Sequence, residues 1–340
     1  MASALTWLRR AAIALGLGAA VLLTAGWTYE HAAEAADAKL KPPGVLVAIG
    51  GQRRLHLVCR GAGAPTVILE PGAGEFSLLV APLQFRIAAF TRVCAYDRAG
   101  YAWSDPAPDG RSFDARAADL AALLRQASVS GPYVMVGSSY GGLLARSFVR
   151  AEPGEVAGVV LVDAAEEQLV FSHLPLFHGA RAAQRDQAVL AEFGVMRLAM
   201  AQLAARARAT GQLPPDATRD EVAAAVAFSG RPSAFRVAAD ESAAFDDTPQ
   251  VERAPGGFGG LGDRPLLVIR HGQPFSGINA PLAVLEPDWP AAQARLAALS
   301  TDSRTIVATR NGHDIAVENP ALVAAAVRTV VQAVRDGRRL

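Results

Sequence analysis

A serine flanked by two glycines is the clearest chemical feature of this 340-residue chain. Gly137, Ser139 and Gly141 form a Gly-x-Ser-x-Gly pattern directly after an apolar run at 133–136. A serine hydroxyl attacks a carbonyl carbon only when a turn exposes it beside a base, with N–H donors for the oxyanion. A strand-to-helix elbow supplies the exposure, and the N–H of Tyr140 supplies one donor. The pattern predicts that Ser139 is the nucleophile of an acyl transfer.

A second motif, from Tyr96 to Tyr101, has the sequence Tyr-Asp-Arg-Ala-Gly-Tyr and also follows an apolar run. With the serine elbow, it resembles the α/β-hydrolase superfamily, in particular a group of bacterial α/β-fold serine hydrolases. The resemblance covers about residues 45–334 and implies the fold of that family. We interpret Asp97 and Arg98 as structural, because polar groups at a sheet edge more often brace the loops there.

A second oxyanion donor should come from the loop after the third strand, as in this family. Residues 70–74 read Glu-Pro-Gly-Ala-Gly and stand where many relatives have His-Gly-x. The resemblance therefore implies Ala73 as the donor that joins Tyr140, and its two flanking glycines permit a close backbone approach. A tight turn without this role is the alternative.

The expected base is one of six histidines. They are His31, His56, His173, His178, His271 and His313. His313 follows the last predicted strand in an Asn-Gly-His-Asp sequence, which resembles the loop that carries the family's histidine over the nucleophile. The order of serine first and histidine last agrees with that fold. We therefore expect His313 to be the base, and His271 to lie at the pocket rim.

The acid departs from the usual pattern of the family. Relatives usually place Asp soon after the strand before the last, but residues 270–275 contain no carboxylate. Asp163 ends the predicted strand at 156–162, a position that some α/β-hydrolases use, and from there it can fix the histidine tautomer. Asp288 is the rival, 25 residues before His313. We favour Asp163, whose structural alternative is a helix cap.

Short apolar runs alternate with helical patterns along most of the chain. The expected strands are 45–49, 54–59, 66–70, 92–96, 133–136, 156–162, 265–270 and 305–309. The first two flank a Gly-Gly-Gln-Arg turn and predict an antiparallel hairpin, whereas the later runs are apolar on both faces, as in covered parallel sheets. The expected fold class is α/β, with a mostly parallel eight-stranded sheet.

Residues 164–262 interrupt this alternation. The interval has no convincing strand but has helical patterns near 180–209, 220–228 and 231–245. Because long loops without structure are uncommon, we expect a helical cap inserted into the sheet domain. The expected division is a membrane-targeting segment at 1–29, a linker at 30–43, the core at 44–163 and 263–340, and the cap at 164–262.

An almost uncharged run at 11–28 follows Arg9 and Arg10. Eighteen residues just suffice to span a bilayer, and arginines in front with aromatic residues at the edges favour an anchor whose amino terminus is cytoplasmic. A signal peptide cleaved at the small-x-small sequences 33–35 or 36–38 is the alternative. Either way, we expect the later domain outside the cytoplasm, either anchored in the bacterial cell envelope or secreted.

Cys59 and Cys94 are the two cysteines, and both lie in strand-like runs. The family's strand order makes those strands neighbours, so one disulfide is compatible with the resemblance, and an exported domain can keep it. Two buried free thiols are the equally favoured alternative. Their spacing does not suggest a metal site.

The charges nearly balance, with 33 basic and 32 acidic residues, so the sequence offers no basic field for nucleic acid. We expect a serine esterase or lipase-like enzyme that acts on a small-molecule ester with an apolar acyl group and uses no cofactor or metal. Ser139 disfavours haloalkane dehalogenases and epoxide hydrolases, which need a carboxylate nucleophile at the elbow. The same serine acting on an amide, thioester or peroxide-linked substrate is an alternative, as is a non-catalytic binding protein; the oligomeric state stays open.

Overall fold

The computed structural model describes residues 2–107, 112–209 and 218–340 and divides into two compact units. One unit comprises Pro42–Arg181 and Val237–Leu340 and contains the sheet; the other comprises Met1–Lys41 and Ala182–Arg236 and contains helices in its described part. This division differs from the expected one. The two ends of the interval 164–262 belong to the sheet unit, and only its middle belongs to the second unit.

The sheet unit is built on eight strands, as predicted. They are β1 (Val45–Gly50), β2 (Arg53–Arg60), β3 (Thr66–Glu70), β4 (Val93–Tyr96), β5 (Tyr133–Ser138), β6 (Val156–Val162), β7 (Leu266–His271) and β8 (Ser303–Ala308). Their order in the sheet is β1-β2-β4-β3-β5-β6-β7-β8. β1 and β2 pair antiparallel, β2 pairs antiparallel with β4, and the remaining pairs are parallel.

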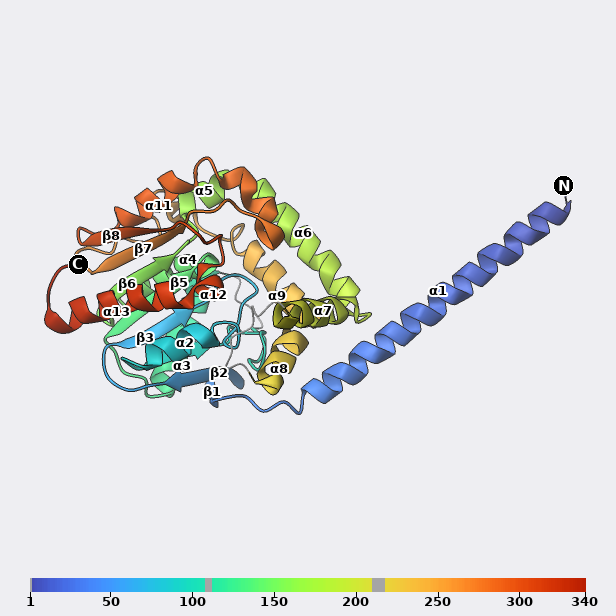
Figure 1. The fold of residues 1–340 in the computed structure, drawn as a ribbon, viewed down its shortest axis with the longest axis horizontal. Coiled ribbons are helices and arrows are strands. Elements are labelled where there is room, and N and C mark those ends of the chain that lie inside the picture. Colours follow the sequence, from blue (N-terminus) through green and yellow to red (C-terminus); the bar gives the residue numbers. More distant parts are fainter. Residues whose placement is uncertain (1, 108–111, 210–217) are drawn as a thin grey trace. The chain divides into compact units, whose positions relative to one another are not determined.

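Helices cover both faces of this sheet (Figure 1). Val134 and Val136 of β5 face the cluster that includes α2 (Ala81–Ala88) and α13 (Pro320–Asp336), whereas Met135 between them faces the cluster that includes α3 and α4. Successive side chains of a strand point to opposite faces, so a strand covered on both sides must be apolar throughout. The helices of the second face are α3 (Phe113–Gln126), α4 (Tyr140–Ala151) and α11 (Trp289–Ala297).

The connection from β6 to β7 is the expected helical insertion, and its described residues contain no strand. Its helices are α5 (Glu167–Ser172), α6 (Leu174–Ala191), α7 (Val195–Ala209), α8 (Arg219–Gly230), α9 (Pro232–Ala243) and α10 (Gln250–Arg253). The helical pattern near 180–209 is two helices rather than one. Gly194 has a φ of +73°, which ends α6 and lets α7 start in a new direction.

α1 (Ala2–Asp37) is a 36-residue helix that continues through most of the expected linker at 30–43. In the described part of the chain it is the single continuous helix long and apolar enough to cross a membrane, and the bent pair α6 and α7 would make a second span if counted together. Glu30 and Asp37 near its carboxyl end pair with arginines of its own compact unit, which explains why the helix does not end with the apolar run.

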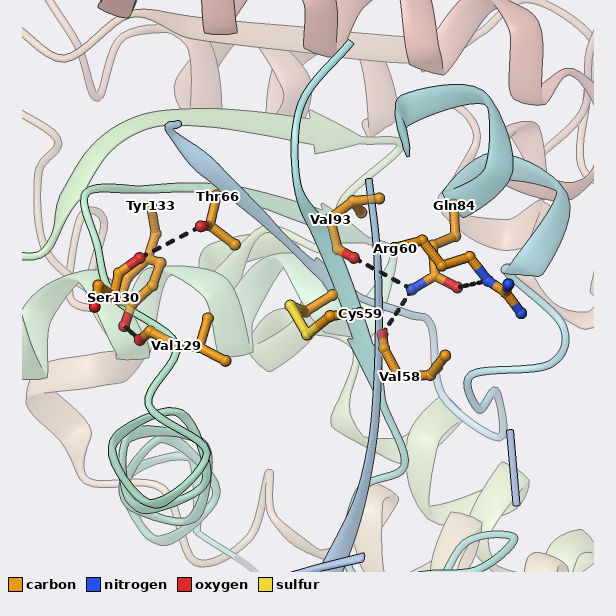
Figure 2. The surroundings of a disulfide bond; sticks show 10 residues. Val58, Cys59, Arg60, Thr66, Gln84, Val93, Val129, Ser130 and Tyr133 are labelled. Carbon is orange, nitrogen blue, oxygen red and sulfur yellow. Dashed lines mark hydrogen bonds between the residues drawn. A yellow bond between two sulfur atoms is a disulfide. The ribbon is translucent and has the colours of Figure 1, made fainter. Parts of the chain in front are cut away.

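Cys59 of β2 and Cys94 of β4 form a disulfide and lie directly opposite each other in the antiparallel pair, with their Cα atoms 4.0 Å apart. Figure 2 shows the amide of Gln84 beside this bond, where its Nε2 donates to the carbonyls of Val58 and Val93 at 2.7 and 3.4 Å. A covalent bond and a buried amide therefore join the amino-terminal hairpin to the parallel part of the sheet. The sequence left a disulfide and two free thiols as alternatives, and the two cysteines form the disulfide.

The remaining short helices flank the sheet edge. α12 (Ile315–Glu318) precedes α13, and a 3₁₀ helix, η1 (Gly277–Leu285), occupies much of the loop between β7 and α11. His271 is the last residue of β7, and His313 lies in the loop between β8 and α12.

Candidate active site

Ser139 lies at the sharp turn between β5 and α4, with φ 49° and ψ −121°, a backbone conformation that L residues rarely adopt. The motif's glycines are required by close packing. A Cβ added to Gly137 would lie 2.6 Å from the carbonyl oxygen of Gly141, and one added to Gly141 would lie 2.1 Å from the carbonyl oxygen of Glu70. The elbow therefore fits against the end of β3 only when these positions have no side chain.

Three of the sequence-predicted residues come together at this turn. The Nε2 atom of His313 lies 2.9 Å from the Oγ atom of Ser139, and its Nδ1 atom lies 2.6 Å from Oδ2 of Asp163. His313 stands in the loop after β8 and is 8% exposed, while Asp163 directly follows β6 and is fully buried. A carboxylate accepts only, so the Nδ1 atom carries the proton and the Nε2 atom is left to accept from the serine hydroxyl.

Asp163 is held by more than His313. Its Oδ1 atom accepts from the backbone N–H of His271 at 3.0 Å and from Nε1 of Trp289 at 2.8 Å, and its Oδ2 atom also accepts from Nδ1 of His271 at 2.6 Å. Burial raises the pKa of this carboxyl group, but the hydrogen bonds from the two histidines outweigh burial and lower it below its usual value. Asp163 is therefore a stably ionised partner for His313.

We expected His271 at the rim of a pocket, but it is buried beside Asp163. It ends β7, is 2% exposed, and bridges Asp163 to Glu286, whose Oε1 atom lies 3.0 Å from its Nε2. Burial lowers the pKa of His271, but the two carboxylates outweigh this effect and raise it. The position of His271 at the end of an apolar run is the signal in the sequence that could have placed it near Asp163. β6 and β7 are parallel neighbours, so their carboxyl ends meet at one edge of the sheet.

Asp288, the rival acid, occupies the N-cap position of α11 and is exposed. Its neighbour Trp289 is buried and is the residue that reaches Asp163. The position of Asp288 along the chain suits an acid, but the Nδ1 atom of His313 already donates to Asp163. The geometry thus favours Asp163 over Asp288.

The expected oxyanion loop lies against the elbow. A Cβ added to Gly72 would lie 3.6 Å from Cβ of Ser139, and the amides of Gly72 and Gly74 donate to Glu75 and Glu241. Ala73 is the exposed residue between them. Tyr140 is the first residue of α4, where backbone N–H groups have no partner within the helix.

Arg98 binds the backbone of the loop at 70–74 through hydrogen bonds. Its Nη1 and Nη2 atoms donate to the carbonyls of Pro71 and Gly72 at 2.9 and 2.7 Å, and its Nε donates to Glu241 of α9 at 2.6 Å. Asp97 accepts from the backbone N–H of Ser77 at 2.8 Å and lies 2.7 Å from His56. Both residues brace backbone, as the sequence interpretation expects for this motif.

Glu70 is buried beneath the same loop. Burial raises its pKa to about 7, although Arg98 and the hydroxyl of Tyr96, which donates at 2.5 Å, both act in the opposite direction. The carboxyl group carries a proton more readily than an ordinary glutamate does. Its Oε2 atom lies 3.8 Å from Nη1 of Arg98.

Asp163, His271 and His313 are also the one trio of metal-ligating side chains that meets among the described residues, with ligand atoms within 4.8 Å of one another. Both Nδ1 atoms must carry protons to bond the carboxylate, and the two carboxylate oxygens already accept four hydrogen bonds. A metal would have to displace these protons. The arrangement of these three residues therefore fits a carboxylate that orients two histidines better than it fits a metal centre.

The sharp turn at Ser139 between a parallel strand and a helix, with His313 in the loop after the last strand, agrees with the family comparison. The family model for the alpha/beta hydrolase fold matches residues 65–273, more than half of the chain. The chain belongs to the α/β-hydrolase fold family. The sequence resemblance is thus confirmed at the level of family and fold.

Curated relatives of this α/β-hydrolase-fold chain match over shorter segments. A non-heme chloroperoxidase of Streptomyces lividans is 42% identical over 106 residues, which are 28% of this chain and 38% of the relative. An uncharacterised protein of Schizosaccharomyces pombe is 30% identical over 161 residues, 39% of this chain and 30% of its own length. The matched segments therefore span well under half of these relatives.

Solved structures resemble the α/β-hydrolase fold over most of the chain. A thermophilic esterase from Thermogutta terrifontis has a TM-score of 0.60 and 22% identity, with 85% of this chain and 98% of the esterase covered. An enol-lactonase from Burkholderia xenovorans has a TM-score of 0.58 and 19% identity, with 84% and 99% covered. At these identities the likeness concerns the fold alone.

Proposed function

We propose that this α/β-hydrolase-fold protein is a serine hydrolase that cleaves a carboxylic ester through an acyl-enzyme on Ser139. One observation carries the proposal. His313 lies between the serine hydroxyl, at 2.9 Å, and the buried carboxylate of Asp163, at 2.6 Å. A nucleophile, a base and a group that orients the base are the three parts that such catalysis needs.

In the proposed reaction, Nε2 of His313 takes the proton of Ser139 while the serine oxygen attacks the acyl carbonyl. The lowered pKa of Asp163 keeps the carboxylate charged, so it holds the histidine tautomer and stabilises the imidazolium that forms. The N–H groups of Ala73 and Tyr140 bind the oxyanion. His313 then gives its proton to the leaving alcohol.

The second half of the reaction reverses these roles. His313 takes a proton from water, the hydroxide attacks the acyl carbon, and the serine oxygen leaves with that proton. Every proton goes to and from His313, so the scheme asks for no metal or organic cofactor. An apolar acyl group is the substrate class that we favour from the Leu-, Phe- and Ala-rich insertion at 164–262.

A second candidate follows from the relative that is named as a non-heme chloroperoxidase. The same acyl-enzyme on Ser139 would pass its acyl group to a peroxide in place of water. Adding hydrogen peroxide to an ester assay separates the two candidates, because peracid accumulates only if peroxide is the acyl acceptor.

We also propose that α1 anchors the protein in the membrane of a bacterial cell envelope, with the sheet unit outside the cytoplasm. The small-x-small sequence at 33–35 lies within α1, and the one at 36–38 contains the last two residues of α1 and Ala38. Cleavage there would remove Glu30, a fully buried residue whose carboxylate pairs with Arg197 at 2.6 and 2.9 Å. Because breaking a buried ion pair is costly, this contact favours an anchor over a cleaved signal peptide.

The experiment that tests the activity compares the full chain with the variant Ser139→Ala. A fluorophosphonate probe should label the wild type and not the variant, and a series of p-nitrophenyl esters of increasing chain length should be hydrolysed by the wild type only. Equal labelling of both proteins would contradict the proposed nucleophile. A mass measurement of the mature chain tests the anchor, because loss of the first thirty or so residues would refute it.

A further inference from the structure

The turn between α6 and α7 packs directly on the end of the apolar run of α1. A Cβ added to Gly26 would lie 2.6 Å from the carbonyl oxygen of Phe193, and one added to Gly194 would lie 2.6 Å from the ring of Tyr29. The axes of α6 and α7 differ by 97° at this turn. All these residues belong to one compact unit, so the turn and this level of α1 are fixed to each other.

Buried ion pairs hold this arrangement in place. Arg197 of α7 donates to both carboxylate oxygens of Glu30 and lies 2.9 Å from Oδ2 of Asp37, which also pairs with Arg231 at 3.2 Å. Arg197 is 6% exposed. A bidentate pair with both partners buried has a defined geometry, so α7 cannot easily slide along α1.

The side chains around the turn are apolar and face outward. Val189 and Leu190 at the end of α6 are 60% and 47% exposed, and Val195 and Leu198 at the start of α7 are 46% and 55% exposed. Two charged residues lie between them. Arg197 is buried, whereas Glu192 is 31% exposed and pairs with Arg236, a 59% exposed arginine of the kind that suits a lipid headgroup layer. Four large aliphatic side chains therefore surround one exposed turn, which is unusual for a surface in water.

The depth of the turn follows from α1. Eighteen apolar residues at 11–28 rise about 27 Å as a helix, close to the thickness of the hydrocarbon core of a bilayer. Trp27 and Tyr29, 49% and 46% exposed, mark the outer boundary, where such rings concentrate. A turn that contacts Gly26 and Tyr29 lies at this same boundary.

From this we propose that the α6–α7 turn is a second membrane contact, in which Val189, Leu190, Val195 and Leu198 insert into the interfacial layer of the bilayer beside α1. The inference rests on α1 being a membrane anchor. The occupant is lipid, because the turn packs on Gly26 and Tyr29 at the end of the exposed apolar run of α1, which we propose spans the membrane. The strong bend favours a turn that lies in the interface over a second span.

Single labelled cysteines test this placement, because both native cysteines are joined in the disulfide and a new thiol is uniquely reactive. Leu190→Cys, Leu198→Cys, Asp186→Cys and Leu22→Cys are prepared in the full chain, labelled with an environment-sensitive fluorophore and placed one copy per lipid nanodisc. Leu22, 75% exposed on α1, is the reference for lipid contact. Asp186, exposed one helical turn before Leu190, is the matched control.

Nitroxide-labelled lipids should quench the probes at Leu22, Leu190 and Leu198, while aqueous iodide should quench the probe at Asp186. If iodide quenches the probes at residues 190 and 198 as it does the probe at 186, while lipid nitroxides still quench the probe at 22, the proposed contact is wrong but the anchor is supported. If Leu22 is also quenched by iodide, the anchor itself fails. If neither iodide nor the nitroxide-labelled lipids quench the probes at residues 190 and 198, protein covers the turn, and this result would also overturn the inference.

Discussion

His271 and His313 approach the same oxygen of one carboxylate, each with its Nδ1 atom 2.6 Å from Oδ2 of Asp163. A second histidine thus stands at the end of β7, near the usual place of the acid, and Asp163, the proposed acid, follows the neighbouring strand β6. None of the hydrogen bonds of His271 in the described structure goes to Ser139. His271 is linked to His313 through Asp163 and through the rings of Phe275 and Trp289, which contact both histidines.

Asp163→Asn should lower ester turnover by about ten-thousand-fold, the size of loss known when a triad carboxylate becomes an amide. The amide has only one accepting atom, so its NH2 group must face N–H donors that the carboxylate accepts from, and the tautomer of His313 is no longer fixed. Asp288→Asn is the control and should keep nearly all activity, because Asp288 is exposed at the start of α11. Measured kcat/KM values check this, and a large loss only in the second variant would contradict the assignment.

His271→Gln should lower kcat/KM by about ten-fold, less than Asp163→Asn, because one charge-assisted hydrogen bond is lost while His313 keeps its own. The pKa of His271 is raised in the folded state. Its stabilising contribution is therefore complete below about pH 6.5, the unfolded value, and disappears as the pH rises through the raised pKa. Denaturant unfolding should show a larger gap between wild type and variant at pH 6 than at pH 9.

Glu70→Gln should change how stability depends on pH. A pKa of about 7 means that the folded protein binds a proton between about pH 4.5 and 7 that the unfolded chain does not bind. The free energy of unfolding of the wild type should fall over this range, by up to about 3 kcal/mol from this group. The variant should lack that component. Parallel pH-dependent slopes for the two proteins would show that Glu70 titrates normally.

Gly141→Ala should disrupt the elbow, because the new Cβ would lie 2.1 Å from the carbonyl oxygen of Glu70 and 2.5 Å from that of Pro71. Backbone must move to relieve such contacts, at a cost of about 1–3 kcal/mol or more. The shift also displaces the loop at 70–74, where we propose an oxyanion donor, so turnover should fall more than the loss of stability alone would cause. Gly154→Ala is the matched control, with nothing within 4 Å of its Cβ, and should change the free energy of unfolding by under about 0.5 kcal/mol.

Much of the sheet unit could be predicted from local patterns. The strands β3 to β7 are largely apolar runs that are buried on both faces, and their composition distinguishes them from amphipathic helices. The strands β1 and β8 are largely exposed. The elbow was equally visible, since Gly137 and Gly141 lie close to Ser139 in sequence. Asp163 and Asp288 could not be separated in this way, because the distance from a carboxylate to His313 depends on how β6, β7 and the intervening loop fold.

Long-range pairs explain what the sequence did not reveal. Glu30 and Arg197 are 167 residues apart, and neither residue alone indicates that α1 extends into the expected linker. The role of His271 was missed for a similar reason, because its partner Asp163 lies 108 residues earlier. The break at Gly194 left a signal in the form of a glycine, but an alanine-rich helical pattern on both sides concealed it.

The disulfide has a consequence for a chain that a protease has nicked. Cys59 and Cys94 are 35 positions apart in the sequence, and the segment between them includes the loop at 70–74 that lies against the elbow. A cut between them would divide the polypeptide into two pieces, but the piece with Ser139 and His313 would stay covalently attached to the piece with α1. Release of the larger fragment would require reduction of the disulfide, so clipping of this loop would damage the protein without separating Ser139 from α1.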